Sequence, residues 1–196
     1  AMGRLAAAWR AGFAMPVIGI TGSNGKTTVK EMLAAILGRD RRVLATSGNL
    51  NNDLGVPLTL FRLGRDVDAA VIEMGANHAG EIAALAAVAR PDVGLVTCCA
   101  PAHVEGFGSV EGVARAKGEM YAALGPDGTA VINADDPWAA YWHEVAGVRR
   151  VLTFGLQPGA DVQARDLGAG PRGRRVEIVT AAGERPLELP LAGQHN

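Results

Sequence analysis

"GITGSNGKTT", residues 19–28, combines a glycine-rich turn with Lys26 and two threonines. In the usual phosphate-binding loop a glycine stands five positions before the glycine that precedes the lysine, but here Ile20 holds that position, and the glycines stand at 19 and 22. A strand, a tight turn and a helix beginning near Lys26 direct backbone N–H groups and the positive helix end toward one point. The stretch therefore predicts a polyphosphate site of unusual spacing. The alternative is an ordinary strand–turn–helix connection with a surface lysine.

The composition is that of a globular protein with closely packed helices. Its 196 residues are enough for one domain with a substantial core. Hydrophobic residues make up 48% of the chain and aromatic residues only 5%, which favours helices packed on a sheet over an all-β core. A formal net charge of −1 argues against non-specific electrostatic binding of nucleic acid, because such binding needs clustered lysines and arginines. We therefore expect no nucleic-acid partner.

Cysteine content and hydropathy indicate the cellular compartment of the protein. The two adjacent cysteines, Cys98 and Cys99, cannot form the disulfide framework that stabilises small secreted proteins. They predict a reducing, cytoplasmic compartment. The apolar opening segment is interrupted by Arg10 and runs straight into the glycine loop, unlike a signal peptide. No stretch reaches the roughly 18 uninterrupted apolar residues that a membrane-spanning helix requires. We expect no membrane insertion.

Short apolar runs alternate with longer stretches of helical period, which is the pattern of a parallel α/β sheet. The expected strands are residues 16–20, 69–74, 93–97 and 129–132, and the expected helices are 26–37, 81–90 and 110–124. Beyond Phe154, period-two segments at 175–180 and 185–191 predict a small antiparallel appendage. The predicted fold class is therefore α/β, a mostly parallel, doubly wound sheet. Its core covers about residues 1–155, and the β appendage covers about residues 156–193.

Polar side chains follow the expected strands at their carboxyl ends, where open parallel sheets bind ligands. Lys26 would neutralise phosphate oxygens, and the Thr27 hydroxyl would bind Mg²⁺. Glu73 ends an apolar strand, where a carboxylate is costly unless it is paired or bound to metal. His103 follows the next strand. The alternatives are a water-exposed acid at Glu73 and a structural histidine at His103.

Six stretches, in order, resemble the central domain of the Mur ligase family. They are "TGSNGKTT" (21–28), "GNLNNDLGVPLTL" (48–60), "EMGANHAGEI" (73–82), "AHVEGFGS" (102–109), "ARAKGEM" (114–120) and "NADD" (133–136). The resemblance implies an ATP-dependent amide ligase that adds D-alanyl-D-alanine to UDP-N-acetylmuramoyl-tripeptide, through an acyl phosphate, in peptidoglycan synthesis. Two alternatives stay open: another amide ligase of the same superfamily, and a nucleotide-binding module without ligase activity.

The resemblance also implies roles for individual residues. The nucleotide would be bound by Thr21, Gly22, Ser23, Asn24, Gly25, Lys26, Thr27, Thr28 and Asn196. Catalytic roles fall to Lys26, Asn52, His103 and Lys117, with Asn52 near the γ-phosphate. One Mg²⁺ would lie between Thr27 and Glu73, and a second between His103 and Lys117. Asn77 and His78 would face the muramoyl substrate.

Lys117 falls in helical register with Val113, Met120 and Tyr121, so its side chain should point toward the apolar face of its helix. One explanation is a packed stem whose ammonium reaches water. The family resemblance implies instead a lysine that reacts with CO₂ to give a carbamate, an anion that can help to bind the second Mg²⁺.

The sequence departs from the family pattern in two places. Thr97 is followed by Cys98 and Cys99 where the family has an asparagine, so an amide is replaced by a weakly hydrogen-bonding thiol. The chain also stops at "GQHN" (193–196), before the motif's second, adenine-binding asparagine. We expect an amino-terminal UDP-binding domain and a carboxyl-terminal ligase domain outside these 196 residues. The isolated fragment should then form no amide bond.

Overall fold

The structure is a computed structural model, which describes residues 1–101, 104–171 and 173–190. Within them, nine strands form one sheet in the order β2-β3-β1-β4-β5-β6-β7-β8-β9. The strands are β1 Val17–Thr21, β2 Val43–Ala45, β3 Ala69–Glu73, β4 Val93–Val96, β5 Thr129–Asn133, β6 Arg150–Gly155, β7 Val162–Gly170, β8 Gly173–Thr180 and β9 Gly183–Leu189. The helices are α1 Met2–Arg10, α2 Lys26–Leu37, α3 Gly55–Leu60, α4 Glu81–Ala89, α5 Val104–Phe107, α6 Val110–Ala122 and α7 Ala139–Ala146.

Strands β1 to β6 are parallel, so their carboxyl ends meet at one edge of the sheet. β1 lies between β3 and β4, with Ile20 opposite Glu73 and Thr21 opposite Val96. This register brings the glycine loop after β1 beside the chain that follows β3 and β4. The strand order therefore assembles the site from segments that lie far apart in the sequence.

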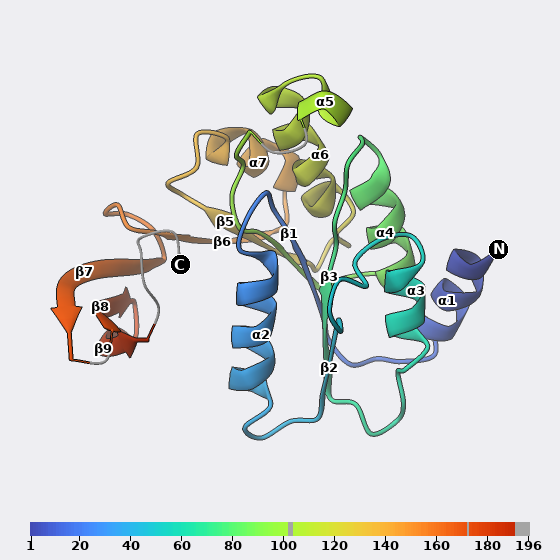
Figure 1. Cartoon of the computed structure of the whole chain (residues 1–196), viewed down its shortest axis with the longest axis horizontal. Helices are drawn as coiled ribbons and strands as arrows, with labels where there is room; N and C mark the ends of the chain where they lie inside the picture. Colours follow the sequence, from blue (N-terminus) through green and yellow to red (C-terminus); the bar gives the residue numbers. More distant parts are fainter. Residues whose placement is uncertain (102–103, 172, 191–196) are drawn as a thin grey trace.

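Helices cover both faces of the parallel strands, as a doubly wound sheet requires. α2 packs against β1, β2 and β3, whereas α1, α3, α4 and α6 contact one another in a separate layer. Figure 1 shows α2 on one side of these strands and α1, α3 and α4 on the other. α7 packs on α6 of this layer, where Tyr121 of α6 and Trp142 of α7 meet edge to face at 6.1 Å and are fully buried. The predicted α/β, mostly parallel fold is confirmed.

The predicted antiparallel appendage is also present. β7, β8 and β9 pair antiparallel, with a bulge between Asp166 and Ala169. The appendage continues the main sheet, because β6 and β7 pair in parallel at Phe154–Val162 and Gly155–Gln163. In Figure 1 it projects away from the helical layers. The division into units at about residue 155 stays a prediction.

The expected elements agree with the structure to within one or two residues, but several elements were not predicted. These are α1, β2, α3, α5, α7, β6 and β7. Arg10, in α1, is 6% exposed and donates to the carbonyls of Phe13, Ala89 and Arg90. α1 is thus held by contacts with a distant segment, which local sequence does not reveal. In the described part of the chain, no helix is long and apolar enough to cross a membrane.

Candidate nucleotide and metal site

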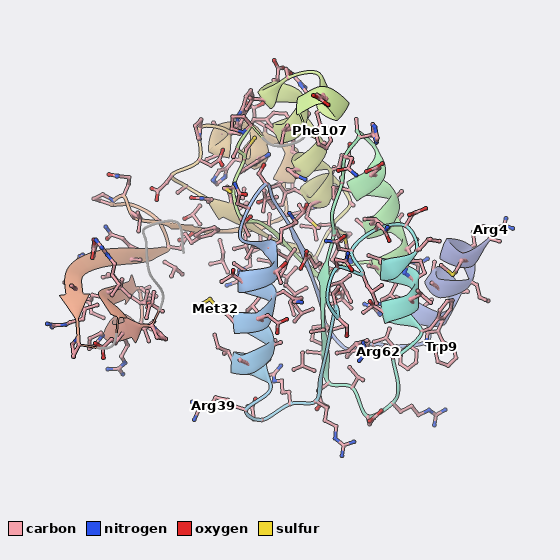
Figure 2. All side chains as sticks on the ribbon, viewed as in Figure 1. Arg4, Trp9, Met32, Arg39, Arg62 and Phe107 are labelled. Atoms are coloured by element: carbon pink, nitrogen blue, oxygen red, sulfur yellow. The ribbon has the colours of Figure 1, made fainter. Side chains whose placement is uncertain are left out.

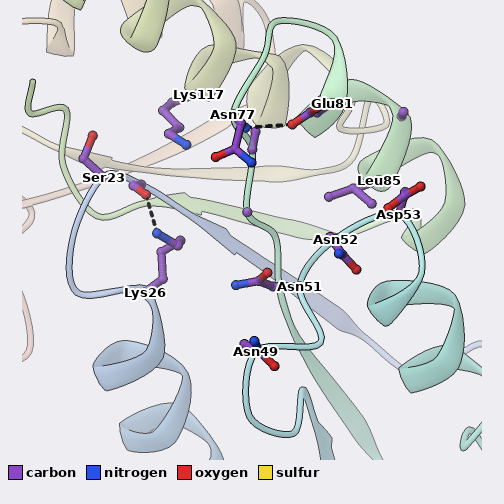
Figure 3. Close-up of a pocket in the computed structure, with 14 residues that line it drawn as sticks. Ser23, Lys26, Asn49, Asn51, Asn52, Asp53, Asn77, Glu81, Leu85 and Lys117 are labelled. Atoms are coloured by element: carbon purple, nitrogen blue, oxygen red, sulfur yellow. Dashed lines mark hydrogen bonds between the residues drawn. The ribbon is translucent and has the colours of Figure 1, made fainter. Parts of the chain in front are cut away.

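A cavity of about 560 Å³ opens at the carboxyl ends of β1 and β3. The glycine loop, the segment before α3, the segment between β3 and α4, and the first residues of α4 form its walls, and α6 contributes one side chain (Figure 3). Its polar lining includes Ser23, Lys26, Asn51, Asn52, Asn77 and Lys117. The structure thus brings together predicted residues from four separate motifs.

The glycine loop has a backbone conformation that only glycine adopts easily. Gly22 has φ of 140°, and a Cβ there would lie 1.9 Å from Oγ1 of Thr97. Gly25, with φ of 77°, is the residue from which α2 begins. Both residues lie where the chain must turn from β1 into α2, which directs the first N–H groups of α2 toward the cavity.

Hydrogen bonds to the segment after β4 hold the glycine loop in place. The N–H of Ser23 donates to the carbonyl of Cys98 at 2.9 Å, and its hydroxyl donates to the carbonyl of Ala100 at 3.1 Å. Oγ1 of Thr97 donates to the carbonyl of Asn24 at 2.5 Å. These bonds hold the loop in place without using the N–H groups at the start of α2.

Lys26 lies across the mouth of the loop. Its Nζ donates to the carbonyl of Gly22 at 2.9 Å, a bond drawn in Figure 3. Since a lysine ammonium carries three donors, this contact leaves two for anionic oxygens. Lys26 therefore places a positive charge beside the positive end of α2, where a phosphate would be attracted.

Glu73 is the acidic centre of the site. The residue is 2% exposed, and its two carboxylate oxygens accept hydrogen bonds from Oγ1 of Thr27 at 3.0 Å and from Nδ2 of Asn51 at 2.8 Å. Both donors are uncharged, and within the described residues Glu73 forms no ion pair. A buried carboxylate without a counter-charge is costly. Together with the Thr27 hydroxyl it makes an oxygen donor set that fits Mg²⁺.

Lys117 projects from α6 toward the cavity. It is 3% exposed, and its Nζ lies 5.6 Å from the centre of the Phe107 ring. Burial, with a smaller contribution from the positive charge of Lys26, lowers the pKa of Lys117 to about 8. At neutral pH a much larger fraction of Lys117 is therefore the neutral amine than in an exposed lysine. The explanation in which the ammonium reaches water does not fit this burial.

Asn77 and His78 lie in the loop before α4. Asn77 lines the cavity, while its N–H donates to Oε2 of Glu81 at 2.7 Å. His78 is exposed, and its Nδ1 lies 3.0 Å from Oε1 of Glu81. The N–H of Asn77, with smaller contributions from His78, lowers the pKa of Glu81. Glu81 thereby orders the loop that presents Asn77 to the cavity.

Asn51, and not Asn52, contacts the acidic centre. Oδ1 of Asn52 accepts from the N–H of Gly55 at 2.9 Å and so supports the start of α3, although Asn52 also borders the cavity. Asn51 donates to Glu73, and sequence reasoning did not single it out. The repeated asparagines of "GNLNND" were the available signal.

Comparison with known proteins identifies the family. A profile described as the Mur ligase middle domain matches residues 20–196. The chain belongs to the Mur ligase middle domain family. It is 46% identical, over its whole length, to the UDP-N-acetylmuramoyl-tripeptide–D-alanyl-D-alanine ligase of Escherichia coli K12, and it covers 44% of that protein.

Two solved structures resemble this Mur ligase middle domain closely. MurF from Acinetobacter baumannii matches 99% of the chain with a TM-score of 0.94 at 39% identity, and the chain covers 43% of it. MurF ligase from Thermotoga maritima, solved in complex with ADP, matches 95% with a TM-score of 0.84 at 32% identity, and the chain again covers 43% of it. The chain thus spans less than half the length of these relatives.

The cysteines that depart from the Mur ligase pattern have distinct surroundings. Cys98 uses its carbonyl to hold Ser23, so this contact does not depend on the missing amide. Cys99 donates its N–H to Asp136 at 2.6 Å, and burial, followed by the charge of Asp136, raises the pKa of its thiol to about 11. Cys99 is therefore a thiol rather than a thiolate at neutral pH.

The remaining site residues of the Mur ligase motifs stay predictions. Thr21 is fully buried, and its hydroxyl has no hydrogen-bond partner among the described residues. Thr28 lies in the first turn of α2. His103 and Asn196 lie outside the described residues. Within the described ranges, no group of three His, Cys, Asp or Glu side chains gathers as a metal site.

Proposed function

We propose that this chain is the nucleotide-binding part of an ATP-dependent ligase that joins D-alanyl-D-alanine to UDP-N-acetylmuramoyl-tripeptide. The observation that carries the proposal is the buried Glu73 carboxylate, which accepts from Thr27 in the turn after the phosphate-loop lysine. The names of its relatives supply the substrates. A pure nucleotide-binding module would not need Lys117 in the same cavity, which favours the ligase.

The residues divide into phosphate-binding and metal-binding groups. The loop from Gly22 to Gly25 and the Lys26 ammonium would bind the phosphates of ATP, and Thr27 with Glu73 would hold Mg²⁺. When bound, Mg²⁺ neutralises charge that builds up on the β- and γ-phosphates. Asn51 keeps one Glu73 oxygen oriented, since it donates to that oxygen.

The ligation has two displacements. A tripeptide carboxylate oxygen bonds to the γ-phosphorus while the bond from that phosphorus to the β–γ bridging oxygen breaks, which releases ADP. The amine of D-alanyl-D-alanine then bonds to the acyl carbon, phosphate departs with the former carboxylate oxygen, and the amine loses a proton. Such transfer depends mainly on positioning and charge neutralisation. Lys26 supplies positive charge to the phosphates, and Asn77 and His78 would face the muramoyl substrate.

Lys117 has a covalent role in this proposal. Its neutral amine bonds through Nζ to the carbon of CO₂ and loses one proton, which gives a carbamate. This anion, with His103, would hold a second Mg²⁺. The modification would thus replace the Lys117 ammonium, which repels a metal ion, by a group that binds one. The lowered pKa of Lys117 supports this role, because the reaction requires the unprotonated amine.

The proposal includes the setting of the enzyme. We expect an amino-terminal UDP-binding domain and a carboxyl-terminal domain that closes over ATP, because relatives are more than twice as long as this chain. A cytoplasmic location agrees with the two free cysteines. Closure of such domains completes a site and excludes water.

Calorimetric titration of ATP in the presence of Mg²⁺ tests the nucleotide site. Lys26→Ala should weaken binding about tenfold to 100-fold, because a charge-assisted contact to phosphate is lost. Arg39→Ala, which removes an exposed cation just beyond the far end of α2, is the matched control and should bind as wild type. Equal affinities for wild type and Lys26→Ala would contradict the phosphate assignment.

Product analysis tests the ligase reaction. The complete protein, given tripeptide substrate, D-alanyl-D-alanine and Mg-ATP, should yield the pentapeptide product by mass spectrometry, whereas the 196-residue chain should yield none. Product formed only from a different acid or amine would support another amide ligase. ATP binding without any product from the complete protein would support the binding module.

A further inference from the structure

Lys30 is a buried cation that the proposed chemistry does not use. It is 1% exposed and lies on α2, three residues after Thr27. Its Nζ donates to the carbonyl of Thr46 at 2.8 Å and pairs with Oε1 of Glu31 at 2.8 Å. The Glu31 side chain is 68% exposed, so water screens that ion pair. A methionine would fill the same space without the cost of burying an ammonium.

Thr46 connects Lys30 to the acidic centre. It follows β2 and is 2% exposed, and its N–H donates to the carbonyl of Val71 at 3.1 Å. Its carbonyl accepts from Lys30, while its hydroxyl accepts the N–H of Glu73 at 2.9 Å. Thr46 is therefore held at three points, one of them the backbone of Glu73.

These hydrogen bonds form a connected network between α2 and the carboxyl ends of β2 and β3. From α2, Thr27 donates to the Glu73 carboxylate and Lys30 donates to Thr46. Thr46 in turn accepts from the Glu73 backbone. We propose that Lys30 is a positioning residue for the metal site, which sets the distance between Thr27 and Glu73 by tying α2 to the chain beside Glu73.

This arrangement explains why the cation is bonded to a carbonyl. An ammonium placed directly on Glu73 would neutralise the carboxylate and compete with a metal ion. Bonded to Thr46, Lys30 anchors the backbone and leaves the two Glu73 oxygens to Thr27 and Asn51. Groups that hold a metal ligand in place through hydrogen bonds commonly change metal affinity by about 10- to 100-fold when they are removed.

The Mg²⁺ dependence of ATP binding tests this inference, which rests on the proposed function. ATP is titrated into each variant at a series of Mg²⁺ concentrations, and the concentration giving half of the gain in affinity is compared. Lys30→Met should raise that concentration about tenfold and leave ATP affinity without Mg²⁺ unchanged. Lys30→Arg should restore part of the loss, and Glu31→Gln, the matched control, should behave as wild type.

Hydrogen exchange provides a readout that needs no metal. The Glu73 amide, which donates to Thr46, should exchange about tenfold faster in folded Lys30→Met, while amides of β5 exchange as in wild type. Thr46→Val removes only the hydroxyl acceptor and should raise the Mg²⁺ requirement similarly, so it decides the matter if Lys30→Met does not fold.

Two failures are distinguishable. Folded Lys30→Met with wild-type Mg²⁺ dependence and wild-type exchange at Glu73 overturns the positioning role, as does a Thr46→Val variant with wild-type Mg²⁺ dependence. A wild-type chain that does not bind ATP with Mg²⁺ refutes the proposed function instead. In that case exchange at the Glu73 amide still decides whether Lys30 positions Glu73.

Discussion

Replacing Lys117 by methionine should stabilise the chain at pH 7, and the gain should fade as pH rises. Burial lowers the pKa of Lys117 from 10.5 to about 8, so at pH 7 the folded protein must hold an ammonium in a site that disfavours it. Methionine has a similar shape without the charge. The prediction applies to CO₂-free buffer, in which the amine stays unmodified.

The magnitude follows from proton linkage. Between pH 8 and pH 10.5 the unfolded chain holds more protons on Lys117 than the folded chain does, so wild-type stability rises with pH across this window. The penalty amounts to about 3 kcal/mol at pH 7 and about 1 kcal/mol at pH 10. The stability difference between Lys117→Met and wild type should therefore shrink by about 2 kcal/mol over that range.

Urea unfolding of both proteins at pH 7 and pH 10 measures this difference. Groups that titrate in both proteins cancel in the comparison, and methionine packing changes the difference equally at the two pH values. The comparison thus isolates the proton on Lys117. A difference that is the same at pH 7 and pH 10 would refute the assignment of a lowered pKa, and with it the main support for carbamate formation.

Three further predictions concern other parts of the site and fold. With ¹³C-labelled bicarbonate and Mg-ATP, NMR should show a carbamate signal that is absent from Lys117→Met; no signal in wild type would leave Lys117 a packing residue. Gly22→Ala should lower both the melting temperature and ATP affinity, because its Cβ would meet Thr97 at 1.9 Å, while Gly159→Ala, with open space around it, should retain wild-type ATP affinity. Arg10→Met should reduce the free energy of unfolding by about 2–4 kcal/mol in urea titration, because buried carbonyls lose a charged donor; an unchanged value would argue against that anchoring role.

Side chains fill the space between the helices and the sheet (Figure 2). Elements whose apolar pattern is contained within one segment could be predicted from the sequence, whereas elements that depend on contacts between segments could not. α2 and α6 were predicted because their apolar residues recur at helical spacing, a signal contained within each segment. β2 has three residues, too few for a periodic signal to stand out. β7 was missed because its glycines, charged residues and bulge interrupt the alternation typical of strands.

The glycine loop after β1, the order of the main strands and helices along the chain, and the family could all be predicted from the sequence, because these depend on residue types at short, fixed spacings. The partners of Glu73 could be found only in the folded chain, since Asn51 is 22 residues away and Thr27 is 46 residues away. The same holds for Lys30, whose helical position predicts an inward-pointing side chain but not the Thr46 carbonyl that it meets. Such pairs arise when parallel strands bring distant segments to one edge of the sheet, and a single sequence carries no local pattern for contacts across that distance.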